Sequence, residues 1–281
     1  AFHMRGRARD EITAKEAAAL AKLGRWEEAV PLLETLLAQA RDPQRRSEAA
    51  TLLVRAHLAL EQVDRIVTLL PQLLAVTGAR YEADFNILLI HGGDTAFHAG
   101  RFDDALLLYQ LALTKEELLA WHEEQIATTE ANLRSRAVTT DLEAAAALRH
   151  RLRTLKAGRA DIADRDSYTE ELFFRKGQSY VELNRKWEAF WTFWSIWKTL
   201  PDSEHARQAL YSAFALAGEL NMHDRAREFG YAFIDTFGPG DFFDEVTLTL
   251  ANLHLNRKEF ADAIALVERA LAQNPEHAFQ D

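Results

Sequence analysis

The chain has 281 residues, a formal net charge of −10 at neutral pH and no cysteine. The absence of cysteine excludes disulfides, thiolate nucleophiles and cysteine-based zinc or iron–sulfur sites, and the negative charge argues against general binding to the phosphates of nucleic acids. There are only 12 glycines and 6 prolines, and no run of about 18 apolar residues that could span a membrane, so the composition predicts an all-helical protein without a membrane-inserted segment.

Four similar stretches recur along the chain: residues 23–29 (LGRWEEA), 99–105 (AGRFDDA), 184–189 (NRKWEA) and 256–263 (NRKEFADA). Each reads as a tight turn, an aromatic side chain, one or two acids and an alanine that opens a helix. This alanine, or the residue in its place, marks the second helix of each unit at Ala29, Ile66, Ala105, Ala145, Ala189, Ala226 and Ala263. The steps of 37, 39, 40, 44, 37 and 37 residues fit two helices and two short turns, which indicates a solenoid of repeated helix pairs.

The first three units, residues 1–113, follow this pattern with local departures. The second unit has Ile66 at the marker position and Pro71 inside its predicted second helix. Pro31 falls early in the second helix of the first unit, where it predicts a kink or a late start of that helix.

The segment 114–165 carries none of the repeat residues, and there is neither Gly nor Pro between residues 101 and 156. Two capping boxes, from Thr114 to Glu117 and from Thr140 to Glu143, predict where its helices begin. We therefore expect two long helices that project from the solenoid as a hairpin.

The last three units, residues 166–281, match a known repeat pattern best. Small residues let the helices approach, aromatic residues fill the space between them and a proline ends the second helix. The residues that occupy the corresponding positions of this pattern are Phe173, Gly177, Tyr180, Ala189, Phe193 and Pro201. On these residues the chain resembles the tetratricopeptide repeat family. The resemblance implies an all-α, right-handed superhelical solenoid of about seven antiparallel helix pairs.

The resemblance also implies a concave face lined by the first helix of each pair. The corresponding positions are Lys15, Lys22, Glu48, Arg55, Arg175, Gln178, Glu182, Tyr211, Asn252 and Asn256. The paired Lys and Asn residues with which some members hold a peptide carboxylate are not reproduced together, so a clamp for free C-termini is not expected. Mixed charge along this face fits an extended peptide or another protein better than a small anion.

The most aromatic segment contains Trp187, Trp191, Trp194 and Trp197 within eleven residues. A helix that is apolar over so wide an arc is buried on more than one side, so one interpretation packs these tryptophans between neighbouring helices. The other interpretation leaves some of them at the surface as a binding or dimer patch, where aromatic side chains dominate the energetics of an interface.

The sequence contains no motif for catalysis, a cofactor or a metal. His91, Asp94 and His98 share one face of a predicted helix, but two ligands separated by two turns are too distant to hold an ion without a further group. The segment that starts at His122 resembles the beginning of a zinc-protease helix, with Ile126 where the second His would be required. Glycine-rich phosphate loops and a nucleophile elbow are absent from the sequence, so we expect no catalytic residue, no cofactor and no metal.

These features predict a non-catalytic scaffold or adaptor that binds peptide or protein segments on its concave face. One alternative is a self-associating homo-oligomeric module that uses the tryptophan helix or the 114–159 hairpin as its interface. Another is a regulatory helical domain of a larger protein. From residue 274 onward the chain reads like the start of a further unit, so the last pair is expected to expose an apolar face.

A linker between two units carries the only indication of location. Pro201, Ser203 and Ala206 follow a spacing similar to that of tetratricopeptide proteins of the bacterial envelope, such as the Tol–Pal coordinator and barrel-assembly lipoproteins. The resemblance favours the bacterial periplasm or cell envelope over the cytoplasm and suggests an envelope assembly as the setting.

Overall fold

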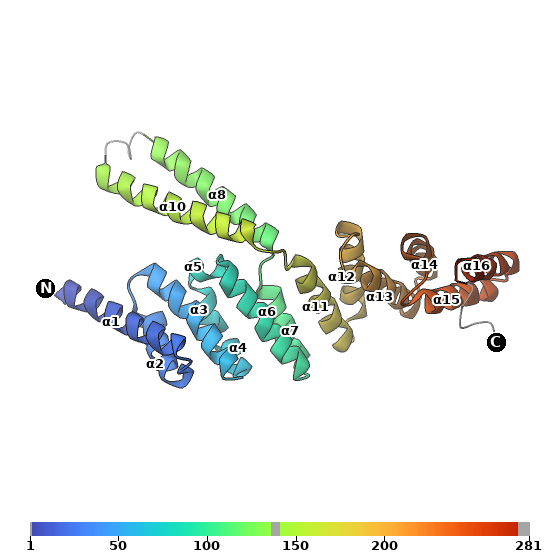
Figure 1. The fold of residues 1–281 in the computed structure, drawn as a ribbon, viewed down its shortest axis with the longest axis horizontal. Coiled ribbons are helices and arrows are strands. Elements are labelled where there is room, and N and C mark those ends of the chain that lie inside the picture. The colour runs from blue at the N-terminus through green and yellow to red at the C-terminus, as the bar shows by residue number, and fades with distance from the viewer. Residues whose placement is uncertain (1, 136–140, 275–281) are drawn as a thin grey trace. The chain divides into compact units, whose positions relative to one another are not determined.

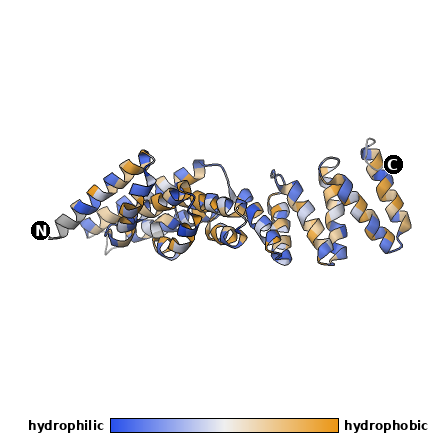
Figure 2. Cartoon of the chain, turned by 90° about the horizontal axis from the view of Figure 1, so that it is seen from below, coloured by the Kyte–Doolittle hydropathy of each residue, from blue (hydrophilic) through white to orange (hydrophobic). Residues whose placement is uncertain are grey.

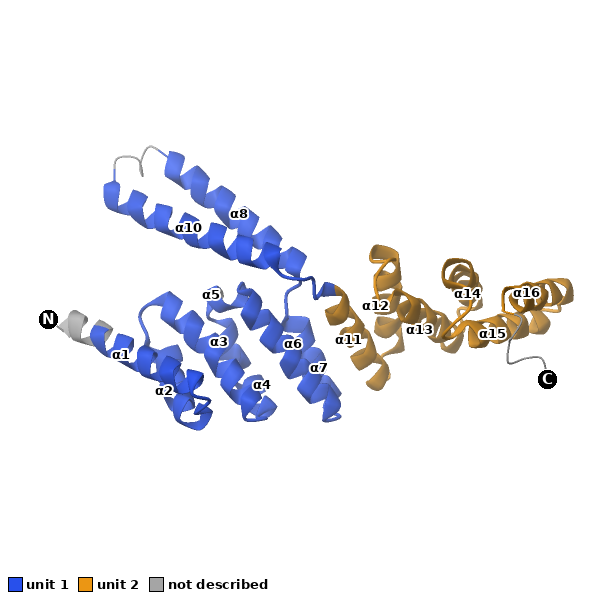
Figure 3. Cartoon of the chain, in the orientation of Figure 1, with its two compact units in different colours: residues 1–169 blue, residues 170–281 orange. Residues whose placement is uncertain are grey.

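The computed structural model describes residues 2–135 and 141–274, and every regular element within these ranges is an α-helix. The chain forms two compact units, residues 1–169 and 170–281 (Figure 3). The all-α prediction is confirmed. Across the described ranges, no helix combines the length and the apolar character that a membrane span requires.

Unit 1 consists of three helix pairs, a short helix and a long hairpin (Figure 1). The pairs are α1 (Phe2–Lys22) with α2 (Trp26–Gln39), α3 (Pro43–Ala59) with α4 (Val63–Leu74), and α6 (Ala83–His98) with α7 (Phe102–Leu111). The short helix is α5 (Thr77–Arg80), and the hairpin consists of α8 (Lys115–Arg134) and α10 (Leu142–Asp164). Helices α8 and α10 pack on each other, and whether they form a domain of their own stays a prediction.

Unit 2 consists of three further pairs around one apolar core. They are α11 (Thr169–Glu182) with α12 (Lys186–Thr199), α13 (Ala206–Glu219) with α14 (His223–Phe237), and α15 (Phe243–Asn256) with α16 (Phe260–Gln273). The core takes phenylalanines from five of these helices, among them Phe174, Phe193, Phe214, Phe229 and Phe243. In both units apolar and polar residues are interleaved along the helices (Figure 2), and the prediction of about seven helix pairs is confirmed.

The same turn joins the two helices in six of the described pairs. Its central residue has a positive φ between 55° and 72°, and the residues at this position are Gly24, Glu61, Gly100, Asn184, Asn221 and Lys258. The next N–H group returns to the carbonyl five residues earlier, for example from Arg25 to Leu20 at 2.9 Å and from Glu259 to His254 at 2.9 Å. This is the Schellman arrangement that ends a helix in the left-handed region. The residue that completes it is already the N-cap of the second helix, which makes the reversal very short.

An arginine at this N-cap position accounts for part of the recurring sequence pattern. Arg101 contacts the carboxylate of Asp104 at 2.6 Å and Arg185 contacts that of Glu188 at 2.7 Å. Hydrogen bonding from Arg185 lowers the pKa of Glu188. Both acids lie in the first turn of their helix, where negative charge complements the helix dipole.

The seven marker residues are all buried, with at most 4% of their surface exposed. Each lies four residues after the N-cap of the second helix, as with Ala29 after Arg25 and Ala145 after Asp141. A small side chain at this position lets the first helix approach, so the spacing pattern found in the sequence has a direct structural cause.

The starts of three helices can be compared with the sequence predictions. Helix α2 begins at Trp26 and includes Pro31, so the late start that Pro31 suggested is not found. The Thr114 capping box is present, with reciprocal bonds between Thr114 and Glu117. The second predicted box begins at Thr140, which lies outside the described residues, and the N-cap observed for α10 is Asp141.

The base of the hairpin is fastened to the N-terminal end of α6. The ring of Trp121 stacks on that of Tyr81, with centroids 3.9 Å apart and planes 5° from parallel. Arg165 pairs with Asp84 at 2.8 Å. Ala83, Leu118 and Ile162 form a small apolar cluster, and Tyr81 packs against it.

A buried histidine adds a polar connection between the hairpin and the preceding segment. The ring nitrogens of His122 lie 3.2 Å from the carbonyl oxygens of Leu155 and Tyr81. Gly158 leaves room for this ring, because a Cβ at Gly158 would lie 2.9 Å from it. The hairpin is therefore docked by a few specific contacts near its base.

The close approach of α11 and α12 depends on a glycine. A Cβ on Gly177 would lie 2.6 Å from the ring of Phe193, whereas a Cβ on Gly218 in α13 would meet no atom within 4 Å. We predict that Gly177→Ala destabilises unit 2 by about 1–3 kcal/mol through overpacking. Gly218→Ala, in the same unit, should be neutral or stabilising by up to about 1 kcal/mol.

Urea unfolding followed by tryptophan fluorescence measures both effects, because Trp187, Trp191, Trp194 and Trp197 all lie in unit 2. Equal midpoints for the Gly177→Ala and Gly218→Ala variants would contradict the assigned packing role of Gly177.

Candidate binding surfaces

The first helices of unit 2 are joined to one another by polar and aromatic contacts. Tyr211 of α13 stacks on Phe242, next to α15, with centroids 4.1 Å apart, and its hydroxyl donates to Glu245 at 2.6 Å. Burial, followed by the contact with Glu245, raises the pKa of Tyr211 to about 12. At the start of α13, His205 contacts Glu171 of α11 at 2.6 Å. Helices α11, α13 and α15 therefore form a continuous layer.

The predicted groove residues of unit 2 lie on this layer. Arg175 is half-buried and contacts Glu171 at 2.8 Å and Gln178 at 3.2 Å. The remaining predicted positions are exposed, and they are Glu182, Asn252 and Asn256. The layer thus presents one guanidinium, one carboxylate and several amides, and we name the face formed by Arg175, Gln178, Glu182, Tyr211, Asn252 and Asn256 the first-helix face.

The predicted groove residues of unit 1 lie on α1 and α3, and two of the four contact acids. Lys15 pairs with Glu11 at 2.9 Å, and Arg55 lies 3.7 Å from Asp84. Lys22 is exposed at the end of α1. Glu48 accepts a hydrogen bond from the side chain of Gln44 at 3.3 Å.

The tryptophan helix α12 divides between the two interpretations drawn from the sequence. Trp194 and Trp197 are half-buried against the core of unit 2. Trp187 and Trp191 are each 52% exposed, and they lie one helical turn apart. The core interpretation therefore describes Trp194 and Trp197, and the surface interpretation describes Trp187 and Trp191. A role of these two exposed tryptophans in binding stays a prediction.

The last helix also presents an apolar surface. Phe260 and Ile264 are 58% and 59% exposed, and Val267 and Leu271 continue the same stripe as half-buried residues. Exposed apolar side chains therefore lie on α16 as well as on α12.

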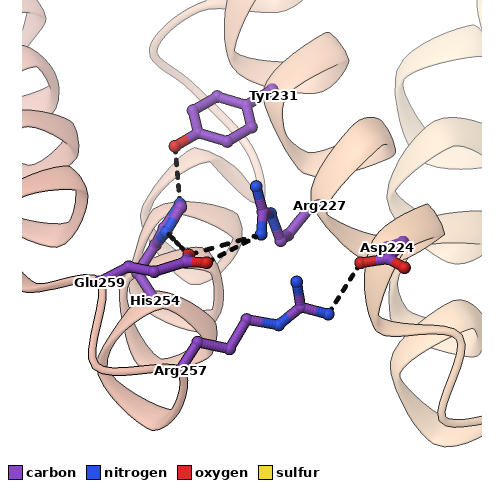
Figure 4. A network of polar contacts seen from close by, with 6 residues as sticks. All are labelled: Asp224, Arg227, Tyr231, His254, Arg257 and Glu259. Carbon is purple, nitrogen blue, oxygen red and sulfur yellow. Dashed lines mark hydrogen bonds and ion pairs between the residues drawn. The ribbon is translucent and has the colours of Figure 1, made fainter.

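A polar network centred on the buried His254 connects α14, α15 and the N-cap of α16 (Figure 4). The Nδ1 atom of His254 lies 2.7 Å from the carboxylate of Glu259, and its Nε2 atom lies 2.7 Å from the hydroxyl of Tyr231. His254 is only 2% exposed. A neutral imidazole satisfies both contacts when Nδ1–H donates to Glu259 and Nε2 accepts from Tyr231. Arg227 approaches the same carboxylate at 3.4 Å.

The ligand atoms of His254, Glu259 and Asp262 lie within 4.8 Å of one another, which is close enough for a shared cation. Both nitrogens of His254 already have partners, however, and the Arg227 guanidinium supplies the positive charge next to Glu259. A metal ion would have to displace these contacts, so the geometry favours a structural role for the network.

His91, Asp94 and His98, which share one face of α6, do not form a metal site. The carboxylate of Asp94 accepts from the hydroxyl of Tyr109 at 2.6 Å. His98 directs Nδ1 at the backbone carbonyl of Asp94 at 2.7 Å, and His91 is exposed. They do not converge on a common point.

A cavity of about 710 Å³ lies between the hairpin and the N-terminal ends of α3 and α6. Its walls include Ser47, Tyr81, Glu82, Trp121 and His122. Sequence reasoning missed this site, since these residues come from α3, α8 and the segment between α5 and α6, which are far apart in the chain. The one available signal was the departure of segment 114–165 from the repeat pattern.

Comparison with known families supports the repeat resemblance over one part of the chain. Residues 17–47 match the family model described as tetratricopeptide repeat. This stretch covers the end of α1, all of α2 and the start of α3. No curated protein matches the chain.

Several solved structures are similar at low identity. Tetratricopeptide-like repeats of a putative kinesin light chain from Podosopora anserina share 15% identity, cover 82% of this chain and 95% of that one, and give a TM-score of 0.36. The C-terminal part of a tetratricopeptide repeat protein from Cytophaga hutchinsonii shares 14% identity over 94% and 96% of the two chains, with a TM-score of 0.34. The TPR2AB domain of yeast Sti1, in a complex with pHSP90, shares 16% identity over 96% and 92%, with a TM-score of 0.33. Likenesses at these TM-scores identify no partner for this chain.

The buried network yields a second stability prediction. Tyr231→Phe removes the hydroxyl that contacts His254 and leaves the buried Nε2 atom without its partner, which should cost about 1–3 kcal/mol. Tyr211→Phe removes a hydroxyl that bonds the exposed Glu245, so the loss should be no more than about 0.5 kcal/mol.

Chemical unfolding of the two Tyr→Phe variants compares like with like within unit 2. If Tyr231→Phe were no more destabilising than Tyr211→Phe, the network would have no structural role. Addition of Zn²⁺ to the unaltered protein should leave the unfolding midpoint unchanged.

Proposed function

We propose that this protein is a non-catalytic scaffold that binds an extended protein segment on the first-helix face of unit 2. The observation that carries the proposal is the position of Tyr211. It is half-buried between α13 and α15, it is held by Phe242 and Glu245, and it is thus a fixed aromatic side chain within a polar surface. Rigid aromatic side chains in such positions are typical anchors of protein interfaces.

The chemistry of the face fits a peptide. The amides of Gln178, Asn252 and Asn256 can each donate and accept hydrogen bonds, as the main chain of an extended segment requires. Arg175 and Glu182 provide opposite charges on one helix, which suits a partner of mixed charge better than a small anion. The repeat architecture supports a role in recognition, because stacked helix pairs create extended surfaces of this kind.

Self-association is the second candidate function, and the exposed apolar side chains of unit 2 favour it specifically. Trp187 and Trp191 leave half of their surface in solvent, and Phe260 and Ile264 leave more than half. Exposed aromatic patches of this kind mark interaction sites more often than inert surface. A role as a regulatory domain within a larger protein would use the same surfaces.

A bacterial envelope or periplasmic setting is the finer part of the proposal. It rests on the linker with Pro201, Ser203 and Ala206 alone. Cell fractionation of the source organism tests it, and recovery of the protein only with the cytoplasmic fraction would refute it.

Affinity capture from a source lysate tests the scaffold function. We expect Tyr211→Ala to lose a specific captured protein, because the anchor is removed, while the binding survives in Thr236→Ala, a substitution at an exposed position of α14 in the same unit. Trp191→Ala should also retain the partner. Loss in Trp191→Ala with retention in Tyr211→Ala would move the binding site to the tryptophan patch, and retention in both would redirect attention to the hairpin of α8 and α10.

Sedimentation across a concentration series tests self-association. If the protein is a scaffold that acts through the first-helix face, it should remain a monomer over the whole series. A concentration-dependent dimer that disappears in a Trp187→Ala/Trp191→Ala double variant would instead support the second candidate. The matched control is Leu248→Ala on α15, which is 43% exposed and outside the patch.

A further inference from the structure

We infer that the cavity between the hairpin and the first three helix pairs binds a single cationic group, a primary ammonium or guanidinium, carried on an apolar stem. The site lies wholly within unit 1 and is independent of the first-helix face of unit 2. Three properties carry the inference: the size and walls of the cavity, an acid without a basic partner, and an aromatic pair beside it.

The cavity has the dimensions of a ligand site. Its volume of about 710 Å³ falls within the range of roughly 300–1,000 Å³ that is usual for small-molecule pockets. One wall is formed by the N-terminal parts of α3 and α6, and the other by α8 and α10. Leu155 and Ile162 of α10 line the cavity and are both buried, so they can contact the apolar stem of a ligand.

Glu82 supplies a carboxylate that lacks a basic partner. Its oxygens accept hydrogen bonds from the hydroxyls of Ser47 at 2.8 Å and Thr51 at 3.4 Å. Among the described residues, no lysine or arginine lies within ion-pair distance of it. The charged neighbours that act on it are Glu48 and Asp84, both acidic, and burial and these acids raise the pKa of Glu82. A bound cation would supply the missing counter-charge.

The one arginine that lines the cavity is already paired with two acids. Arg165 pairs with Asp84 at 2.8 Å and with Asp161 at 2.9 Å, and all three line the cavity. An incoming anion would therefore find no available basic group in the lining. A divalent metal is also disfavoured, because the carboxylates of Glu82, Asp84 and Asp161 do not gather into a ligand cluster within the described chain.

The aromatic pair offers a second attraction for a cation. Tyr81 and Trp121 stack in parallel, so one face of each ring is covered by the other, Arg80 lies 6.0 Å from the Tyr81 centroid, and both rings line the cavity. Tryptophan and tyrosine faces attract ammonium and guanidinium groups, more strongly when water is partly excluded. A carboxylate and aromatic rings in one apolar recess together favour a monocation over a neutral ligand.

The test compares two probes that share a stem. Isothermal titration of the full chain with n-hexylammonium should show saturable binding, whereas 1-hexanol should bind about tenfold more weakly or not at all, because it lacks the charge. This comparison needs no variant, so it cannot fail through misfolding. Equal affinity of n-hexylammonium and 1-hexanol would overturn the inference. It would also be overturned if neither n-hexylammonium nor the lysine peptide described below binds.

Variants then locate the binding. Glu82→Gln keeps the acceptor for Ser47 and removes the charge, and we expect n-hexylammonium to bind about tenfold more weakly. Asp103→Asn, at an exposed acid of α7, is the matched control and should bind as the unaltered protein does. Trp121→Leu should weaken n-hexylammonium binding by about threefold or more. Unchanged binding in Glu82→Gln would refute the assignment of the site.

A further arm separates the two sources of such a cation. A capped Ala-Ala-Lys-Ala-Ala peptide is compared with the same peptide carrying norleucine in place of lysine. Binding of the lysine peptide with a Glu82→Gln dependence identifies a protein side chain as the ligand. Binding of n-hexylammonium alone, with the same dependence, identifies a free amine, and both results support the cationic site.

Discussion

The geometry of the reversing turn constrains most of this structure. Each reversal places one residue in the left-handed region, as at Gly24 and Gly100, and the next residue both ends one helix and begins the following one. Glycine and asparagine adopt this conformation at the lowest cost, and Glu61 and Lys258 adopt it without that advantage. Five residues further on, a small buried side chain such as Ala29 lets the paired helices touch. Because both requirements are local, the same unit can be repeated under very different surfaces.

The hairpin of α8 and α10 departs from the repeated unit in the length of its helices and in the way it is held. Helices α8 and α10 are longer than their neighbours, and they are docked by individual contacts: the Tyr81–Trp121 stack, the Arg165–Asp84 ion pair and the ring of His122. These contacts lie at the base and leave a recess beside them. The individuality of unit 1 therefore comes from the segment that departs from the repeat pattern.

Polar groups contribute to this protein mainly where they are buried. The Arg–acid pairs at the turns, such as Arg185 with Glu188, are largely exposed, and pairs of that kind add little stability. In contrast, His254 is enclosed and uses both ring nitrogens. Loss of a partner there leaves a buried polar atom unsatisfied, which is costly. Glu82, in contrast, is a half-buried acid whose partners are hydroxyl groups only. A cationic ligand can therefore supply the counter-charge that the protein does not provide there.

The sequence by itself determined the helix pairs, their spacing and the turns between them, because helical periodicity, left-handed turn residues and buried small side chains all act within a few residues. It also indicated two long helices within segment 114–165, through the lack of Gly and Pro. Only the tertiary structure decided that Trp187 is exposed while Trp197 packs on the core. It alone brought Tyr81, Glu82 and Trp121 to one cavity. Such contacts join residues far apart in the chain, and they depend on how helices pack rather than on any local preference.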